Sequence, residues 1–314
     1  MDTMTATPSV TLPSPAPDGV LRLAHLGVIR ARGDDAAAFL HGQLSQDFAL
    51  LGVPGARLAA YCSPKGRMLA SMIGIKRAAD EVLLICHHDV LAATLKRLSM
   101  FVLRAKVKLD DASAGFELWG QVGTSALPAG EPWQMLDAPA GVSRVGLYPA
   151  AGLTRSLWVA PAGHEAPAGP PLEPATWAWL EVLSGVTMIS APLVEAFVPQ
   201  MLNYESVGGV NFKKGCYPGQ EVVARSQFRG TLKRRTYLAA VDAPMSVGQE
   251  VYHPSDADQP TGTIVACSPA PNGGWHALVS MQVSSADGQA LHLGQAEGPT
   301  LRLLPLPYPL LDDI

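Results

Sequence analysis

The chain has 314 residues, of which 48% are hydrophobic and 16% charged, and its formal net charge is −4 at pH 7. This composition indicates a compact protein of two or three domains, each large enough to bury a core. No apolar run approaches the ~20 residues that a membrane helix needs. The acidic balance, with a sequence pI of 6.1, does not favour a dedicated nucleic-acid-binding protein.

The N-terminus and the cysteine spacing favour a cytoplasmic protein with reduced thiols. Residues 1–18 are rich in proline and lack a basic-then-apolar signal pattern, so we expect a disordered tail there. The four cysteines stand far apart, without a C-x-x-C pair or zinc spacing, at Cys62, Cys86, Cys216 and Cys267. We therefore expect no resident metal site and a reducing compartment.

Short strands and helices alternate through the first 120 residues. Residues 20–32 predict strands, and Asp34 or Asp35 is expected to cap a helix at 36–44. A second helix with a basic last turn is expected at 89–99. Further strands are expected at 57–60, 68–75, 81–86, 107–109 and 115–120. This alternation indicates an α+β body.

The sequence changes character after Arg235. A Pro/Ala/Gly loop at 161–175 precedes a helix expected at 176–184. Short β-like runs then follow at 236–241, 250–252, 262–267, 276–281 and 301–304, and their spacing predicts a small β-barrel. We therefore divide the chain into a tail (1–18), two α+β regions (19–113 and 114–232) and a C-terminal β-barrel (233–314).

One segment, Asn211-Phe-Lys-Lys-Gly-Cys-Tyr-Pro-Gly-Gln-Glu221, places a thiol beside a cation and ahead of a turn. Pro218 and Gly219 suit a tight turn, and a helix is expected to follow it. The positive charge of Lys214 and a nearby helix N-terminus both favour the thiolate of Cys216. The alternative is a packed loop, because free cysteine is among the most buried residue types.

The same region concentrates positive charge. Seven of the 23 basic residues lie between Lys213 and Arg235, opposed only by Glu221. A local positive field on an acidic chain points to an anionic ligand. A solvated charged face remains the alternative.

The segment Phe212–Glu221, together with Pro199–Asn203 before it and Arg225–Arg235 after it, resembles the signature of the YgfZ-type folate-binding proteins. These proteins are relatives of the T-protein, the aminomethyltransferase of the glycine-cleavage system. Upstream, Gly33–Asp47 resembles the family's first helix, and Tyr61–Arg67 resembles its first central turn. The likeness covers residues 20 to 240, and the β-rich end of the chain fits the family's barrel.

The resemblance implies a three-domain α+β fold around a central hole that holds tetrahydrofolate or another reduced folate, with a C-terminal β-barrel. It also implies an accessory role in the assembly or repair of iron–sulfur enzymes, including those that modify tRNA. The implied partners are folate and transient iron–sulfur client proteins, in the cytoplasm and away from membranes. A well-defined catalytic turnover is not implied.

Two departures from the relatives bear on the chemistry. T-proteins carry an acidic pair after a glycine turn, whereas no carboxylate follows Gly66 here, so aminomethyl transfer is not favoured. Many relatives also place a glutamate two positions before the glycine that is Gly185 here. The nearest acid in this chain is Glu181, two positions earlier still and ~200° around a helix, so we expect it to face away. Glu195 or a backbone group would then bind the pterin.

The candidate site residues follow from the motif and the resemblance. Cys216 and Lys214 form a candidate thiol site, for exchange with a client or attack on a folate-bound one-carbon unit. A single cysteine cannot hold a [4Fe–4S] cluster, which usually takes four thiolates. Tyr217 and Glu195 are the candidates for the pterin ring. The candidates for the folate glutamate carboxylates are Lys65, Arg67, Arg225 and Arg229.

Three functions remain open at this level. The first is a folate-binding accessory protein for iron–sulfur enzymes. The second is a folate-dependent one-carbon transferase, and the third is an RNA-binding module that uses the basic segment 213–235. The third predicts a steep salt dependence of RNA affinity.

Overall fold

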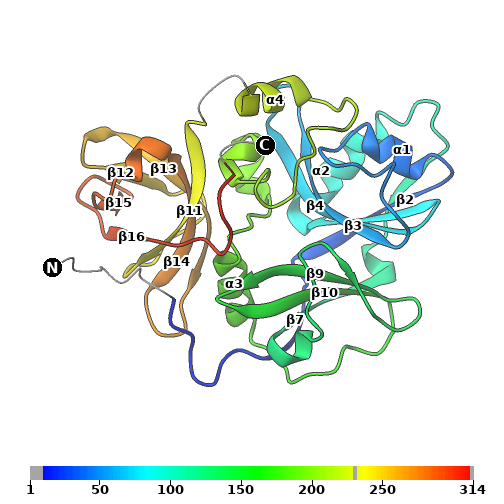
Figure 1. Cartoon of the computed structure of the whole chain (residues 1–314), viewed down its shortest axis with the longest axis horizontal. Helices are drawn as coiled ribbons and strands as arrows, with labels where there is room; N and C mark the ends of the chain where they lie inside the picture. The colour runs from blue at the N-terminus through cyan, green and yellow to red at the C-terminus, as the bar shows by residue number, and fades with distance from the viewer. Residues whose placement is uncertain (1–9, 229–231, 312–314) are drawn as a thin grey trace.

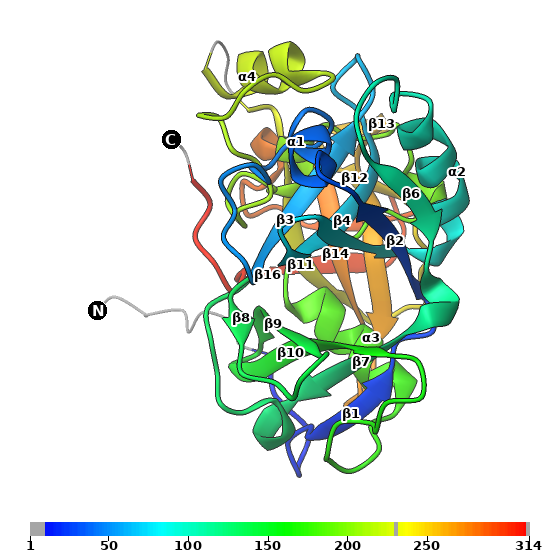
Figure 2. The ribbon, with the colours of Figure 1, turned by 90° about the vertical axis from the view of Figure 1, so that its right-hand side faces the viewer.

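The computed structural model describes residues 10–228 and 232–311. Two open sheets and a closed barrel meet around the middle of the molecule (Figure 1). In the view of Figure 2 the first sheet lies above the second. Among the described residues, no helix is long and apolar enough to cross a membrane.

The first sheet is antiparallel, and both of its faces are buried. Its strand order is β3-β4-β5-β2-β6. Leu84 faces a core beneath the two helices, whereas its neighbours Leu83 and Ile85 face the main core between the lobes. This explains the near-continuous apolar run in β5. The elements are β2 (Leu26–Arg32), α1 (Ala36–His41), β3 (Gly55–Cys62), β4 (Met68–Ala78), β5 (Glu81–His87), α2 (His88–Ser99) and β6 (Lys108–Asp111).

The second sheet has the order β1-β7-β10-β9-β8, and it takes a strand from the start of the chain. The predicted run 20–32 is broken at 23–25, and its first part pairs with β7 of the second sheet. The β9–β10 hairpin was not expected from the sequence. The elements are β1 (Gly19–Arg22), η1 (Ser113–Gly115), β7 (Phe116–Val122), η2 (Gly123–Ala126), β8 (Met135–Leu136), β9 (Ser143–Ala150) and β10 (Leu153–Pro161).

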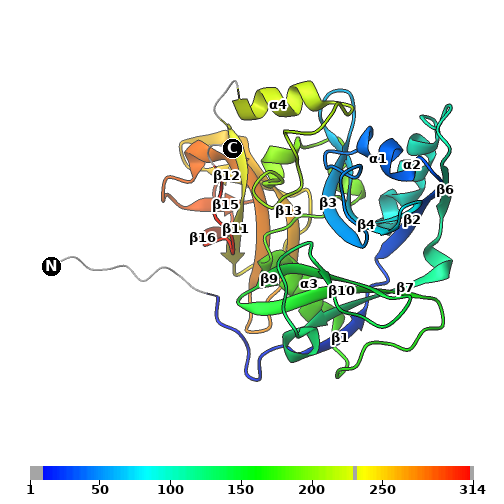
Figure 3. The same cartoon turned by 45° about the vertical axis from the view of Figure 1, so that its right-hand side comes forward.

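A helical segment joins the sheets to the barrel. The helix α3 packs against β13 and β14 of the barrel, and its Trp177 and Trp179 are almost fully buried. The Trp179 indole N–H donates to Nδ1 of His276 at 2.7 Å. These elements are α3 (Pro174–Leu183), η3 (Ala191–Leu193), η4 (Pro199–Leu202) and α4 (Gln220–Phe228). The helix α4 lies between the barrel and the first sheet (Figure 3).

The predicted C-terminal β-barrel is confirmed. Six strands close in the order β11-β14-β13-β12-β15-β16, which leaves no free sheet edge. The strands are β11 (Arg234–Val241), β12 (Glu250–His253), β13 (Asp256–Pro269), β14 (Trp275–Gln282), β15 (Leu291–Leu293) and β16 (Thr300–Leu304), with η5 (Val283–Ser285) after β14. The three-lobed α+β architecture expected from the sequence is therefore observed.

Two local expectations are modified. The helix expected at 36–44 ends at His41, and the Asp35 carboxylate accepts the Lys106 N–H at 2.7 Å instead of capping the helix. Of the predicted tail, residues 1–9 lie outside the described residues. Residues 10–18 form no helix or strand, but Val10 packs against the core and the Thr11 carbonyl accepts from Asn272 at 3.1 Å.

Candidate functional site

Two glycine turns that are distant in the sequence pack back to back and position the Lys-Gly-Cys-Tyr segment. Gly66 follows β3 with φ +70°, and Gly219 precedes α4 with φ +81°. A Cβ atom at Gly219 would lie 2.4 Å from the Ser63 carbonyl oxygen and 2.7 Å from Gly66 Cα. Only glycine fits such a left-handed position in so little space. The Pro-Gly turn of the motif is thus locked onto the first sheet.

Lys214 is held by backbone oxygens. Its Nζ donates to the carbonyl oxygens of His41 at 2.6 Å, Leu44 at 3.0 Å and Gly215 at 3.1 Å. The ammonium also lies 4.6 Å from the centre of the Tyr217 ring. Burial lowers the pKa of Lys214 to about 8, although the nearby charge of Asp47 opposes this shift. Lys214 therefore ties the motif to the end of α1.

This lowered pKa predicts a measurable pH dependence of stability. From about pH 8 to 10.5 the unfolded chain holds more protons at Lys214 than the folded chain, so the free energy of unfolding rises with pH. Between pH 7.5 and 9.5 we expect this residue to contribute a rise of ~1–2 kcal/mol. Urea denaturation at the two pH values measures it. The control is Lys214→Met, which should lack this rise; an equal rise in both proteins would contradict the assignment.

The four cysteines separate into one exposed thiol and three covered ones. Cys216 is exposed, whereas Cys62 and Cys86 are buried and Cys267 is partly buried. Burial raises the pKa of the Cys62 and Cys86 thiols to about 12, which makes them inert. Cys216 is therefore the cysteine that a partner could reach.

Of the other residues predicted for the folate, Glu195 and Arg67 lie close together, because the Glu195 N–H donates to the Met68 carbonyl at 2.8 Å. Tyr217 is 6% exposed and packs over Lys214, so its ring is already covered. Glu195 is exposed in a left-handed conformation with φ +60°. Arg67 donates to the Ala196 carbonyl, and Lys65 is exposed.

The basic segment 213–235 presents less free charge than its sequence suggests. Arg225 pairs with Glu221 at 2.6 Å on the surface of α4. Arg235 is buried against Glu205, and Lys214 is bonded to carbonyl oxygens. Arg229 lies outside the described residues. The positive field available to a polyanion is correspondingly reduced.

A cavity of about 220 Å³ lies where the two sheets, α3 and the barrel meet. Its walls include side chains from β4, β9, β10, α3 and the β13 strand of the barrel. Apolar side chains form most of the lining, aromatic ones among them, and a few polar groups complete it. The aromatic and polar lining residues include His25, His87, Trp133, Tyr148, Arg155, Trp177 and Glu181.

None of the folate-binding residues predicted from the sequence and described by the structure lines this cavity. Glu181, which we expected to face away from the pterin, contributes to the wall of this cavity. Its helix neighbours Trp177 and Ser184, one turn before and after, line the same cavity. Leu183 stands at the position where many relatives have the glutamate. It packs into the core and is not among the residues that line the described cavity.

Glu181 and His25 form a polar pair in the cavity. The His25 Nε2 atom lies 3.6 Å from a Glu181 carboxylate oxygen. Burial opposes ionisation of both groups, yet each stabilises the charge of the other. The net effect lowers the pKa of Glu181, with help from Arg155, and raises the pKa of His25. Glu181 therefore remains a carboxylate at neutral pH.

Arg155 is a buried cation with few partners. Its residue is 3% exposed, and its guanidinium carbon lies 4.4 Å from the centre of the Trp177 ring. Of the five N–H donors of an arginine, Nη1 reaches the Tyr148 carbonyl at 3.5 Å, which is a weak contact. The Nε atom has no partner among the described residues. Burial lowers the pKa of Arg155 to about 10.

The fold and the sequence both have known counterparts. The glycine cleavage system aminomethyltransferase T of Bartonella henselae superposes with a TM-score of 0.70 at 15% identity, over 94% of this chain and 86% of the other. The tRNA-modifying protein YgfZ of Cronobacter sakazakii is 30% identical, over 88% of this chain and 89% of its own. The chain belongs to the YgfZ family.

Further YgfZ proteins support this assignment. The tRNA-modifying protein YgfZ of Colwellia psychrerythraea is 31% identical, over 74% of this chain and 76% of its own. That of Edwardsiella ictaluri is 27% identical over 92% of both chains. No protein-family model matches the chain. The T-protein likeness establishes the fold of this YgfZ-family protein. It carries no argument about function, because the two sequences are 15% identical.

The polar groups of the cavity escaped the sequence analysis of this YgfZ-family member. His25 lies at the break between β1 and β2, inside the range 20–32 that was predicted to form strands. Arg155 stands between Thr154 and Ser156 in the strand Leu153–Pro161, which ends in an apolar run. A charged residue within a buried strand is a signal that could have been used, because arginine is almost never fully buried without a partner.

Proposed function

We propose that this YgfZ-family protein binds a reduced folate in its central cavity and supports iron–sulfur enzymes, including those that modify tRNA. The observation that carries the proposal is the cavity, in which apolar walls with three aromatic rings surround one carboxylate and one under-bonded guanidinium. A flat heterocycle with hydrogen-bond donors and acceptors on its edge suits these walls. Tetrahydrofolate, which the family resemblance implies, has such a ring.

The residues of the cavity fit the pterin end of that ligand. Trp133, Tyr148 and Trp177 offer ring faces and edges, and Glu181 offers two acceptor oxygens for N–H groups. Ligand pockets typically measure ~300–1,000 Å³, and this cavity measures about 220 Å³. We therefore expect it to take the ring while the aminobenzoyl-glutamate tail extends outward. A bound reduced folate would supply a ring that can carry a one-carbon unit.

Cys216 provides the second part of the proposal. Its exposed thiol lies on the motif that Lys214 and Gly219 fix in place, and it does not line the cavity. Such a thiol can exchange with a client protein that approaches from solvent. A transferase mechanism gains less support. The chain has no carboxylate directly after Gly66, and the cavity carboxylate of Glu181 already interacts with His25.

Fluorescence titration with tetrahydrofolate tests ligand binding. We expect the wild-type protein to bind with a Kd in the micromolar range, about −8 kcal/mol. Glu181→Gln keeps the shape of the side chain but loses a charge-assisted hydrogen bond worth ~1.5–3 kcal/mol, so its affinity should fall ~10- to 150-fold. Absence of binding to the wild-type protein would remove the folate part of the proposal.

The same variants separate the ligand from the thiol in cells. In a strain without its own copy, wild type should restore iron–sulfur enzyme activity, and Glu181→Gln should restore it poorly. Cys216→Ser should bind tetrahydrofolate as wild type does and still fail to restore activity. Cys86→Ala, which removes a buried thiol that does not line the described cavity, is the control and should restore activity. Full restoration by Cys216→Ser would return Cys216 to a structural role.

A further inference from the structure

Arg155 and Glu181 give the central cavity two polar groups of opposite hydrogen-bonding character. Arg155 can only donate, and the Glu181 carboxylate can only accept. The two charges interact electrostatically, and both side chains line the same cavity. A ligand that satisfies both must present an acceptor to one and donors to the other.

The need for an acceptor at Arg155 is unusually strong. The side chain comes from β10, where it pairs across to Leu147 and Val122, so its backbone position is fixed by the sheet. Its guanidinium lies over the Trp177 ring and holds one weak bond to Tyr148, and its Nε has no partner in the part of the chain that the structure describes. An unsatisfied buried donor destabilises the folded protein, and more so when it is charged. A ligand oxygen that reaches this guanidinium from the cavity would offset that cost.

The neighbouring strand provides a contrast. Arg144 on β9 is also buried, at 5% exposed, yet it is well bonded. Its Nη2 donates to the Ala126 and Leu127 carbonyls, and its Nε donates to Ser156 Oγ at 3.2 Å. It does not line the cavity. The two buried arginines on these adjacent strands therefore differ in how well their N–H groups are hydrogen-bonded, and it is Arg155 that could donate to a ligand.

We propose that Arg155 determines ligand specificity by requiring a carbonyl oxygen on the heterocycle, so that the cavity selects 4-oxo pteridines over 4-amino ones. This inference rests on the proposed function. The 2-amino-4-oxo ring presents an oxygen beside its ring N–H and amino group. The oxygen accepts from Arg155, while the N–H and amino group donate to Glu181. In a 2,4-diamino ring, an amino group replaces the oxygen and points hydrogens at the guanidinium.

The carboxylate alone would not produce this preference. A diamino ring is the more basic of the two and would suit Glu181 at least as well. Discrimination in favour of the oxo ring therefore reports on Arg155. A site that hydrogen-bonds a ligand group rejects an analogue that leaves its buried donor unpaired.

The experiment compares two probes, 6-methyltetrahydropterin and its 2,4-diamino analogue, by calorimetric or fluorescence titration. Wild type should prefer the oxo ring at least 10-fold. Arg155→Met should reduce the preference below 3-fold, and Arg155→Lys, which keeps donors, should retain part of it. Arg144→Met is the matched control and should leave the preference unchanged.

The outcomes separate the two proposals. Equal binding of both rings by wild type, or an undiminished preference in Arg155→Met, would overturn the role of Arg155 and leave folate binding intact. Binding of neither ring by wild type would contradict the proposed function itself, and this inference with it. If Arg155→Met does not fold, Arg155→Lys decides: a preference smaller than that of wild type supports the proposal, and an undiminished preference overturns it.

Discussion

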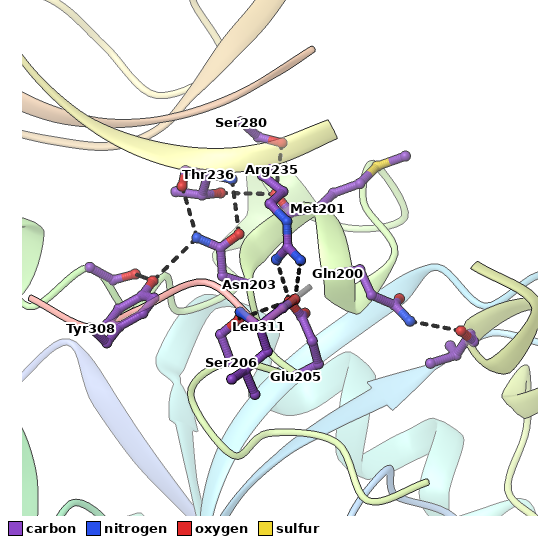
Figure 4. A network of polar contacts seen from close by, with 12 residues as sticks. Gln200, Met201, Asn203, Glu205, Ser206, Arg235, Thr236, Ser280, Tyr308 and Leu311 are labelled. Atoms are coloured by element: carbon purple, nitrogen blue, oxygen red, sulfur yellow. Dashed lines mark hydrogen bonds and ion pairs between the residues drawn. The ribbon is translucent and has the colours of Figure 1, made fainter. Parts of the chain in front are cut away.

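Replacing Arg235 with Met is expected to lower the free energy of unfolding by ~3–5 kcal/mol, the usual cost of breaking a buried ion pair. Arg235 on β11 donates to Glu205 and to the Leu311 carbonyl (Figure 4). The Glu205 side chain is 0% exposed and that of Arg235 is 5% exposed. Removal of the guanidinium leaves a buried carboxylate without its countercharge.

The loss should also depend on pH. Burial raises the pKa of Glu205 even with Arg235 present to oppose the shift. Without Arg235 the folded state should bind a proton at Glu205 more readily than the unfolded state does. The loss of unfolding free energy in Arg235→Met is therefore largest at neutral pH. It becomes smaller as the pH falls toward the pKa of an ordinary carboxyl group. Urea denaturation followed by circular dichroism at pH 7 and pH 5 measures both effects.

The double variant Glu205→Gln/Arg235→Met provides the control. It removes both charges, and it should recover part of the stability that Arg235→Met loses, because a buried pair is often replaceable by neutral groups. A deficit below ~1 kcal/mol in Arg235→Met would instead indicate that the pair behaves like a surface salt bridge. The neighbouring bonds of Asn203 to Thr236 and Tyr308 remain in either variant (Figure 4).

This ion pair illustrates a limit of sequence analysis. Counting charges along 213–235 counted Arg235 and Lys214 as parts of a positive surface. Both are buried against partners, Glu205 and the carbonyl oxygens at the end of α1. These partners lie 30 or more residues away in the sequence, so the local charge pattern does not reveal them. A run of basic residues therefore predicts a positive face only where each side chain reaches solvent.

The elements themselves were more predictable than the site. The six-stranded barrel follows from short apolar runs with turn residues between them, and these signals are local. The exposure of Cys216 also agrees with its Gly-Cys-Tyr-Pro-Gly context. The cavity depends on His25, Arg155 and Glu181, which come from three separate segments. Their convergence is set by tertiary packing, so no local pattern contains it.

The Pro-Gly turn of the motif yields the second large expected effect. Gly219→Ala should destabilise the protein by ~2–4 kcal/mol, because a left-handed alanine is strained and its Cβ would overlap packed atoms. Gly288 is the matched control, since its φ is +89° and no atom of the described residues lies within 4 Å of the position of a Cβ atom. Gly288→Ala should therefore cost only the strain, ~1 kcal/mol. Thermal or urea denaturation of the two variants measures the difference.

That difference isolates close packing from backbone conformation. If both alanines cost the same, the contact between Gly219 and the Ser63–Gly66 turn contributes nothing, and the glycine is explained by its φ alone. If Gly219→Ala costs more, the turn is fixed to the first sheet by direct contact. In that case Gly66→Ala, whose Cβ would lie 2.8 Å from Val222 Cβ and 3.3 Å from the Gly219 carbonyl oxygen, should be destabilised as well. Both turns would then require glycine, because a side chain on either one would occupy the space of the other. Together the two turns hold Cys216 at the surface.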